Sequence, residues 1–250
     1  MLDARTYHHL HKNTSSTNRV NNDYLSKEKH AADSPPDPVF QHLLPPTIPG
    51  FGFHDKKWNF IPVDDIDEEL HWNVEAFDHL VLKSPKKDLI RALVTKHIAS
   101  SNGNVNGSGN DVIANKGSGL ILLLHGSPGT GKTLTAESVS ELIQRPLYRI
   151  TSGDMGTNAK EAEQYLESVL YLASVWRCVV LLDEADVFLE QRSQQDLEHN
   201  ALVSVFLRMI EYYFSGILFL TTTRIGTLDG AFKSRVQLAV HYPPLDESSR

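Results

Sequence analysis

The octapeptide GSPGTGKT, residues 126–133, directly follows the apolar run LILLLH at 120–125. It satisfies the pattern G-x-x-x-x-G-K-[ST], in which glycines let the backbone turn so that successive N–H groups face phosphate oxygens. The pattern stands where a phosphate-binding loop requires it, after an apolar strand and before a helix. These residues therefore predict a strand, a phosphate-binding loop and a helix in succession. The alternative is an empty turn with the same residues.

The positions of this loop have predicted contacts with a bound nucleotide. Lys132 would reach the β- and γ-phosphates, and the hydroxyl of Thr133 would ligate Mg²⁺. The helix that begins near Lys132 would add the positive end of its dipole. We therefore predict that the loop binds the phosphates of a nucleotide together with Mg²⁺. The predicted binding residues are Gly126, Ser127, Pro128, Gly129, Thr130, Gly131, Lys132, Thr133 and Leu134.

A second motif is VVLLDEAD at 179–186, an apolar strand that ends in two adjacent carboxylates. Asp183 would lie at the carboxyl edge of the sheet, where open α/β sheets bind ligands, and would hold Mg²⁺ there together with Thr133. Glu184 follows at once and is placed to act as a general base on the attacking water. A surface acidic cluster that caps the next helix is the alternative, and Asp186 is interpreted as such a cap.

Apolar runs alternate with helical patterns after residue 118. The runs lie at 120–125, 147–151, 178–183, 217–222 and 236–242, and helices are predicted at 132–144, after the capping residue Asn158, and at 196–213. The run CVVLLD at 178–183 is continuously apolar, as expected for a strand buried on both faces. This alternation predicts an α/β fold with a parallel sheet flanked by helices.

Composition divides the chain into four predicted parts: a disordered tail at 1–57, an upstream helical segment at 58–100, a flexible linker at 101–118 and the nucleotide-binding core at 119–250. The tail is rich in Asn, Ser, Thr, His and Pro, so it carries too little apolar surface to offset the entropy of ordering. In the upstream segment, Ser84 and Pro85 predict the N-cap and first turn of a helix.

The composition also limits the classes of partner. A formal net charge of −7 argues against a broad electrostatic grip on nucleic acid or anionic membrane, although a local basic patch stays compatible with it. The single cysteine, Cys178, cannot form an internal disulfide, and the N-terminus lacks the apolar segment of a signal peptide. We therefore expect an intracellular protein, cytoplasmic first, with a nuclear location left open. The histidines of the tail, His8, His9 and His11, allow a metal site or a plain polar tail.

The motifs GSPGTGKT, LLDEAD and LTTTRIGTLDGAFKSR resemble those of the AAA family of ATPases. The longer runs GLILLLHGSPGTGKTLTAESVSE and HNALVSVFLRMIEYYFSGILFLTTTR are similar to a group of fungal AAA ATPases of unassigned function. The resemblance covers the chain from Trp58 to its end. It implies a P-loop NTPase core, Mg-dependent ATP hydrolysis, a homo-oligomeric ring in the complete protein, and remodelling of an unknown protein substrate.

The resemblance also assigns roles to two further residues. Thr223 stands at the γ-phosphate-sensing position, where the family usually has Asn; its hydroxyl can donate a hydrogen bond but reaches less far. Arg235, in FKSRVQ, is the best match to the arginine finger, which stabilises transition-state charge at the neighbouring subunit. A surface arginine at a strand entrance is the alternative for Arg235. With Glu184, these two residues complete the predicted catalytic set.

Two departures from the family limit what the resemblance implies. The loop after the second strand reads SGDMG at 152–156, without the aromatic residue of members that thread polypeptides, so threading is not supported. The sequence stops at Arg250, where the family's helical lid would follow, and we interpret this as a fragment or a truncated sequence. For that reason we expect this chain to bind ATP weakly, to be mostly monomeric and to turn over slowly.

Three functions compete on this evidence. The first is an ATPase core, favoured by Glu184 and Arg235. The second is a binding or scaffold protein that holds ATP with little turnover, favoured by Thr223 and the absent lid. The third is a small-molecule kinase with the same loop, which seldom needs the adjacent Asp-Glu pair.

Overall fold

The computed structural model describes residues 1–11, 45–67, 70–102, 119–156, 158–189, 196–224 and 229–244. These residues form two compact units, which divide between Leu70 and His71. The first unit contains a short helix and a β-hairpin, and the second contains the predicted phosphate-binding loop. Each unit has its own elements and is described by itself.

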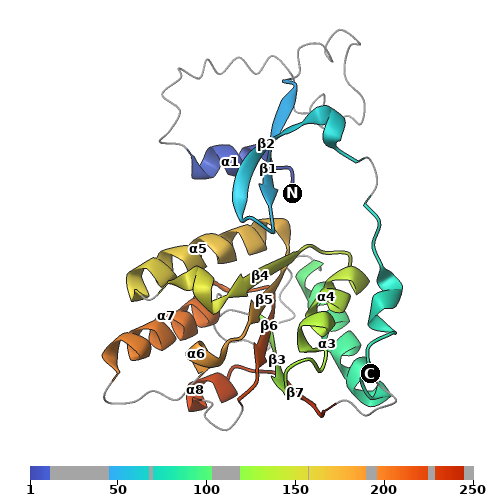
Figure 1. Cartoon of the computed structure of the whole chain (residues 1–250), viewed down its shortest axis with the longest axis vertical. Coiled ribbons are helices and arrows are strands. Elements are labelled where there is room, and N and C mark those ends of the chain that lie inside the picture. The colour runs from blue at the N-terminus through green and yellow to red at the C-terminus, as the bar shows by residue number, and fades with distance from the viewer. Residues whose placement is uncertain are drawn as a thin grey trace. The chain divides into compact units, whose positions relative to one another are not determined.

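The second unit is built around a parallel sheet of five strands (Figure 1). The strands are β3 (Leu120–Gly126), β4 (Leu147–Thr151), β5 (Val179–Asp183), β6 (Ile217–Thr222) and β7 (Leu238–Tyr242). Their order across the sheet is β4-β5-β6-β3-β7. The prediction of a parallel α/β sheet is therefore confirmed, and the observed strands start up to two residues later than the predicted runs.

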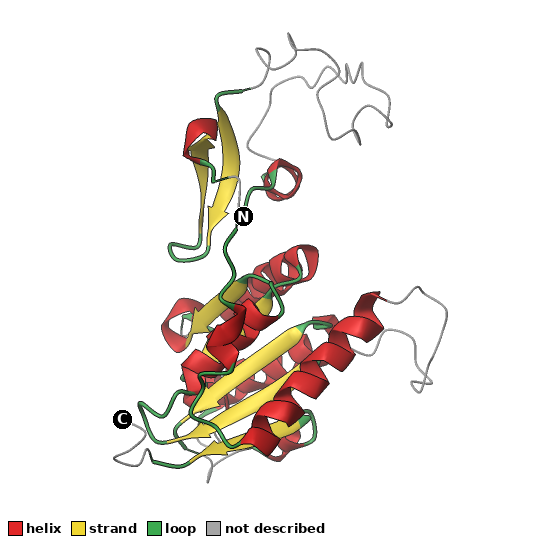
Figure 2. Cartoon of the chain, turned by 90° about the vertical axis from the view of Figure 1, so that its right-hand side faces the viewer, coloured by secondary structure: helices red, strands yellow, loops and turns green. Residues whose placement is uncertain are grey.

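Helices cover both faces of this sheet (Figures 1 and 2). On one face lie α3 (Ser84–Asn102) and α4 (Lys132–Leu142), and on the other lie α5 (Ala159–Trp176) and α7 (Leu197–Tyr213). The shorter elements are α6 (Asp186–Leu189), α8 (Gly230–Lys233), η3 (Val74–Phe77) and η4 (Ser152–Met155). This layering explains why the central strands read as continuous apolar runs: every residue of β5 and β6 is buried.

Local capping sets where the helices begin. The side chain of Asn158 accepts a hydrogen bond from the Lys160 N–H at 2.9 Å, which confirms the predicted N-cap of α5. Asp196 caps α7 in the same way through the N–H of His199. The helix α3 differs by one residue from the prediction, because Ser84 is its first helical residue and the Lys83 carbonyl accepts from Lys86 and Lys87.

The parallel arrangement brings the carboxyl ends of β3, β5 and β6 to one edge of the sheet. His125 of β3 lies opposite Thr222 of β6, and Leu182 of β5 lies opposite Leu220 of β6. The next residues along β3 and β5 are Gly126 and Asp183. This edge is where open α/β sheets bind ligands. The fold therefore places the two predicted motifs next to each other.

The first unit contains the ordered parts of the predicted tail. Residues 1–57 were expected to be disordered, but α1 (Ala4–Leu10), β1 (Thr47–Gly52) and the start of β2 (Lys57–Pro62) are ordered, with η2 (Val63–Asp65) after them. The cause is an aromatic cluster in which the Tyr7 ring lies 4.4 Å from that of His11 and 5.3 Å from that of Trp58. Tyr7 and Trp58 are far apart in the sequence, so a compositional window does not detect their contact. Residues 12–44 of the predicted tail lie outside the described residues.

The predicted boundaries after the tail change as well. Trp58 belongs to the antiparallel strand β2, so the segment 58–100 begins as a strand, and its helical elements are η2, η3 and α3. The break between the compact units falls at Leu70, within that segment. The helix α3 ends at Asn102, and residues 103–118 of the predicted linker lie outside the described residues.

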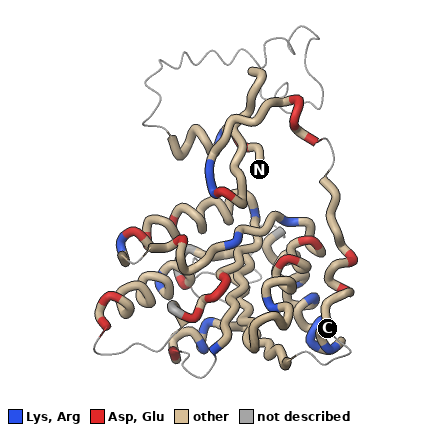
Figure 3. The backbone as a smooth tube through the Cα atoms, in the orientation of Figure 1, with Lys and Arg blue, Asp and Glu red and all other residues tan. Residues whose placement is uncertain are grey.

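Charged residues of both signs are interspersed along the second unit (Figure 3). Individual pairs set its local electrostatics, such as Arg208 of α7 with Glu163 of α5. None of the helices in the described ranges has both the length and the apolar composition of a membrane span.

Candidate nucleotide site

The glycines of the loop adopt backbone angles that favour glycine. Gly126, Gly129 and Gly131 have φ values of +146°, +72° and +90°. A Cβ atom on Gly126 would lie 2.2 Å from the carbonyl oxygen of Tyr242 on β7, whereas no atom lies within 4 Å of a Cβ placed on Gly129 or Gly131. At position 126, both the packing against Tyr242 and the positive φ therefore favour glycine. Gly129 and Gly131 border open space beside the loop.

The remaining loop residues divide into an exposed tip and a buried base. Ser127, Pro128 and Gly129 are exposed, while Thr130 is buried and its hydroxyl donates to the Ser127 carbonyl at 2.8 Å. The turn is thus held by its own contacts. Its exposed tip is free to present backbone N–H groups to a phosphate chain.

Lys132, the first residue of α4, points back into the loop. Its Nζ donates to the carbonyl oxygens of Gly126 at 2.8 Å and Ser127 at 2.7 Å, and only 8% of the residue is exposed. Burial lowers the pKa of Lys132, while the charges of Asp183 and Asp186 partly offset this effect. The ammonium group is therefore held at the positive end of α4 by neutral acceptors that a phosphate oxygen can replace.

Thr133 and Asp183 come together from elements 50 residues apart. The hydroxyl of Thr133 donates to the Asp183 carboxylate, with oxygen–oxygen distances of 3.1 and 3.3 Å. Asp183 is 6% exposed, and its carboxylate also accepts from the Thr221 hydroxyl at 2.5 Å. A hydroxyl and a carboxylate side by side form a hard-oxygen pair of the kind that Mg²⁺ prefers.

The donor set fits magnesium that is bound mainly through phosphate and water. Within the described ranges, no group of three or more His, Cys, Asp and Glu side chains is placed to hold a metal ion. Mg²⁺ in nucleotide sites typically takes one or two protein ligands and completes its shell with phosphate oxygens and water. Thr133 and Asp183 meet that requirement.

Glu184 has an unusual backbone conformation directly after the strand. Its φ of +54° is left-handed, a region that non-glycine residues seldom occupy and that often marks functional positions. The conformation is held by two contacts to Thr221, whose hydroxyl accepts from the Glu184 N–H at 3.0 Å and whose carbonyl accepts from the Ala185 N–H at 2.8 Å. The Glu184 residue is exposed at the carboxyl edge. The Glu184 side chain is therefore accessible to solvent at the carboxyl edge, as a general base that activates water must be.

Two residues without a site role predicted from the sequence, Thr221 and Asp186, organise this edge. Thr221 bridges Asp183 and the backbone of Glu184. Asp186, interpreted above as a helix cap, accepts from the hydroxyl of Thr222 and from the N–H groups of Thr223 and Arg224. The polar pair Thr221–Thr222 at the end of an apolar strand was the available signal for both roles. Thr223 itself is exposed just after β6, and its sensing role stays a prediction.

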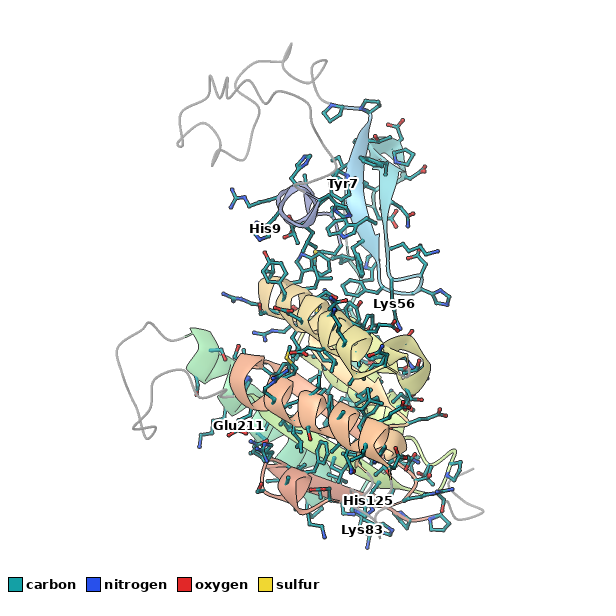
Figure 4. All side chains as sticks on the ribbon, turned by 90° about the vertical axis from the view of Figure 1, so that its left-hand side faces the viewer. Tyr7, His9, Lys56, Lys83, His125 and Glu211 are labelled. Atoms are coloured by element: carbon teal, nitrogen blue, oxygen red, sulfur yellow. The ribbon has the colours of Figure 1, made fainter. Side chains whose placement is uncertain are left out.

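Arg235 is engaged within its own subunit. One guanidinium nitrogen donates to the Ala231 carbonyl at 2.8 Å, and another forms an ion pair with Glu211 of α7, which is labelled in Figure 4. Its Nε is buried and has no hydrogen-bond partner among the described residues. The structure places Arg235 just after α8, and its action on a neighbouring subunit stays a prediction.

Two cavities beside the loop were not predicted from the sequence. They measure about 560 and 160 Å³, and both are lined by Leu80–Leu82, Thr130 and Tyr242; the smaller also includes Leu134. The hydroxyls of Tyr242 and Thr135 lie 2.7 Å apart, and burial raises the pKa of Tyr242 to about 12. An apolar wall with a neutral hydroxyl pair next to a phosphate loop suits a nucleoside. The run HLVL at 79–82, before α3, was the sequence feature that could have indicated this apolar wall.

Residues 122–244 match the model of a family described as "ATPase family associated with various cellular activities (AAA)". Curated relatives agree with this match. ATPase family AAA domain-containing protein 3-B of Xenopus laevis is 32% identical over 144 residues, covering 55% of this chain and 24% of the relative. The Lon protease of Leptospira interrogans is 30% identical over 139 residues, covering 52% of this chain and 15% of the relative. The chain thus spans about a quarter or less of these relatives, and the matched residues form an AAA-type domain.

A solved structure shares the fold. A chain of the "Structure of E. coli MS115-1 HORMA:CdnC:Trip13 complex" superposes with a TM-score of 0.51 at 20% sequence identity. The superposition covers 70% of this chain and 68% of that one. At this identity the likeness concerns the fold alone.

The packing of Gly126 generates a stability prediction with a matched control. Gly126→Ala forces a Cβ against the Tyr242 backbone, so it should lower the free energy of unfolding by about 1–3 kcal/mol, the usual cost of overpacking, in addition to backbone strain. Gly129→Ala has free space and should cost only the left-handed penalty of roughly 1–2 kcal/mol. Urea unfolding measures both variants. Equal losses of stability would show that the contact with β7 is unimportant.

Proposed function

We propose that this chain binds ATP together with Mg²⁺ at the loop of residues 126–134 and hydrolyses it, with Glu184 as the base. The observation that carries the proposal is the contact of Thr133 with Asp183 at 3.1 Å, next to the buried ammonium of Lys132. A phosphate loop, a hard-oxygen pair and an exposed carboxylate then share one edge of the sheet. The match to the AAA family supports the same reaction.

The residues divide the work of binding. Lys132 would exchange its loop carbonyls for the β- and γ-phosphate oxygens, and the N–H groups at the start of α4 would face the same phosphates. The cavities lined by Leu80–Leu82 and Tyr242 would hold the base and ribose. Thr133 and Asp183 would hold Mg²⁺, which would supply positive charge against the phosphates.

Hydrolysis adds two demands on the chain's own residues. Glu184 would accept a proton from the attacking water, and its left-handed backbone directs it away from the buried strand. Thr223 would donate from the end of β6, where Asp186 holds its N–H. These two residues directly follow the neighbouring strands β5 and β6, so a water between them would face the phosphate chain.

The proposal also covers oligomeric assembly and the protein partner. In the complete protein we propose a homo-oligomeric ring in the cell interior that remodels a protein partner of unknown identity, with Arg235 acting on the neighbouring subunit's nucleotide. The resemblance to fungal AAA ATPases and the domain match support this. The loop SGDMG, most of which forms η4, carries no aromatic side chain, so we propose remodelling without threading.

A second candidate function is nucleotide-dependent binding with little turnover. Thr223 favours it, because its hydroxyl replaces the longer carboxamide usual at the sensing position. The ion pair of Arg235 with Glu211 favours it too, since the guanidinium is already occupied within its own subunit. The two functions differ in turnover and not in ATP affinity.

Removing the ammonium group of Lys132 tests the binding site. Lys132→Ala deletes a charge-assisted contact worth about 1.5–3 kcal/mol, so ATP affinity should fall roughly tenfold to a hundredfold in calorimetry. Lys160→Ala removes an exposed lysine of α5 and should leave the affinity unchanged. If Lys132→Ala keeps the parent affinity with an intact circular dichroism spectrum, the loop is not the binding site.

Glu184→Gln separates ATP binding from ATP hydrolysis. The amide keeps the size of the carboxylate but cannot take a proton, so this variant should bind ATP as the parent does and retain it unhydrolysed in a single-turnover assay. Glu167→Gln, on the exposed side of α5, should hydrolyse at the parent rate. Parent-like hydrolysis by Glu184→Gln would exclude Glu184 as the base. A parent that binds ATP without measurable turnover would favour the scaffold function.

A pair of variants distinguishes a finger from a structural ion pair at Arg235. In the complete protein, Arg235→Ala should lose ATPase activity, and mixing it with Glu184→Gln subunits should restore part of that activity, because each intact base then meets an intact arginine from its neighbour. Glu211→Gln breaks the same ion pair but keeps Arg235, so it should stay active. Equal losses in Arg235→Ala and Glu211→Gln, or no recovery in co-assembled mixtures, would refute the action between subunits.

A further inference from the structure

Arg149 of β4 forms an ion pair with the carboxylate that would hold the metal. Its guanidinium nitrogen lies 2.6 Å from Oδ2 of Asp183. The strand register explains the contact. Thr151 lies opposite Asp183, and Arg149 precedes Thr151 by two residues, so both β4 side chains stand on the same face of the sheet. The long arginine side chain then runs along the strand to reach the carboxylate.

The two partners of this ion pair differ in their freedom to move. The side chain of Asp183 is 8% exposed and that of Arg149 is 52% exposed. Asp183 is also bound by Thr133 and Thr221, from α4 and β6. Arg149 stands on an edge strand of the sheet. The arginine can therefore leave for solvent while the carboxylate stays in place.

In the nucleotide-free chain, Arg149 supplies the positive charge that a divalent cation would bring. Lys132 bonds to the loop carbonyls, so the guanidinium is the cationic group in direct contact with Asp183 among the described residues. A bare metal ion would have to displace this guanidinium or bind beside it, and like charges at such a separation repel. A nucleotide brings several negative charges with the metal, which removes this repulsion.

We propose that Arg149 is the resident counter-ion of the metal site and makes metal binding dependent on the nucleotide. It neutralises Asp183 when the loop is empty and disfavours a divalent cation without phosphates. Arg149 is thus a positioning residue that acts through Asp183. The inference rests on the proposed function, because it takes Thr133 and Asp183 as the metal ligands.

The test measures Mn²⁺ binding to the nucleotide-free full chain by electron paramagnetic resonance of the free ion. Arg149→Gln removes the charge and should tighten Mn²⁺ binding roughly tenfold, a moderate value because the arginine is half exposed and screened by solvent. Arg149→Lys keeps the charge and should stay within about threefold of the parent, since a lysine still repels the metal. Arg208→Gln is the matched control, because Arg208 is equally exposed at 52% and pairs with Glu163 on a neighbouring helix. It should bind Mn²⁺ as the parent does.

A double variant assigns the gain to the proposed ligand. Asp183→Asn combined with Arg149→Gln should lose the tighter Mn²⁺ binding. Arg149→Met, which keeps the aliphatic stem, serves as a second neutral variant if Arg149→Gln unfolds at a lower temperature than the parent. Unchanged or weaker Mn²⁺ binding in both neutral variants would overturn the inference. So would an equal gain in Arg149→Lys, or a gain that survives Asp183→Asn.

The same measurements separate this inference from the proposed function. Mn²⁺ binding is measured without nucleotide, whereas the proposed function requires that the parent bind ATP with Mg²⁺ in calorimetry. If the parent binds ATP and the neutral variants show no gain, only the role of Arg149 fails. If the parent does not bind ATP and the neutral variants still gain Mn²⁺ affinity, the nucleotide function fails while the counter-ion role holds.

Discussion

The buried carboxylate of Asp183 links four elements of the second unit, namely β5, α4, β6 and β4. It stands at the end of β5 and accepts hydrogen bonds from Thr133 of α4, Thr221 of β6 and Arg149 of β4. A charge this deeply buried is stable only when it is paired and hydrogen-bonded, so these elements must keep their relative positions. The same requirement that holds the edge of the sheet together thereby places the groups suited to Mg²⁺ and phosphate.

Three cationic groups that the two proposals involve have partners in the free chain. Lys132 is held by carbonyls of the loop, Arg149 by Asp183 and Arg235 by Glu211. A ligand that engages any of them exchanges one set of contacts for another, and the net gain is smaller than the strength of the new contact. Glu184 differs from them, because it is exposed and carries a left-handed backbone at the end of a buried strand. The cations proposed for binding therefore already have hydrogen-bond partners in the free chain. The group proposed for the reaction is the exposed Glu184 carboxylate, whose backbone is left-handed.

Local patterns predicted the elements of the second unit, whereas the ordered elements of the first unit depend on contacts between distant segments. The run of β-branched and leucine residues in β5, the cap at Asn158 and the start of α7 near Asp196 depend on short-range signals, and these predictions are confirmed. The order of α1 and the β1–β2 hairpin comes from ring contacts of Tyr7 with His11 and Trp58. The Trp58 contact joins segments separated by a polar and proline-rich stretch. Composition within a sequence window does not report such a contact, so the ordered elements within the predicted tail could not be predicted from it.

The sequence by itself determined the phosphate loop, the class of fold and the residue types at the site, because glycine angles, capping and apolar periodicity are local properties. Only the tertiary structure decided which side chains meet: Arg149 and Thr221 with Asp183, Glu211 with Arg235, and Leu80–Leu82 with Tyr242. Periodicity in a strand states which face a residue occupies, but the partner on that face depends on strand order and register. In a parallel sheet these partners lie a whole crossover apart, as with Arg149 and Asp183 at a separation of 34 residues, so their pairing exists only once the sheet has formed.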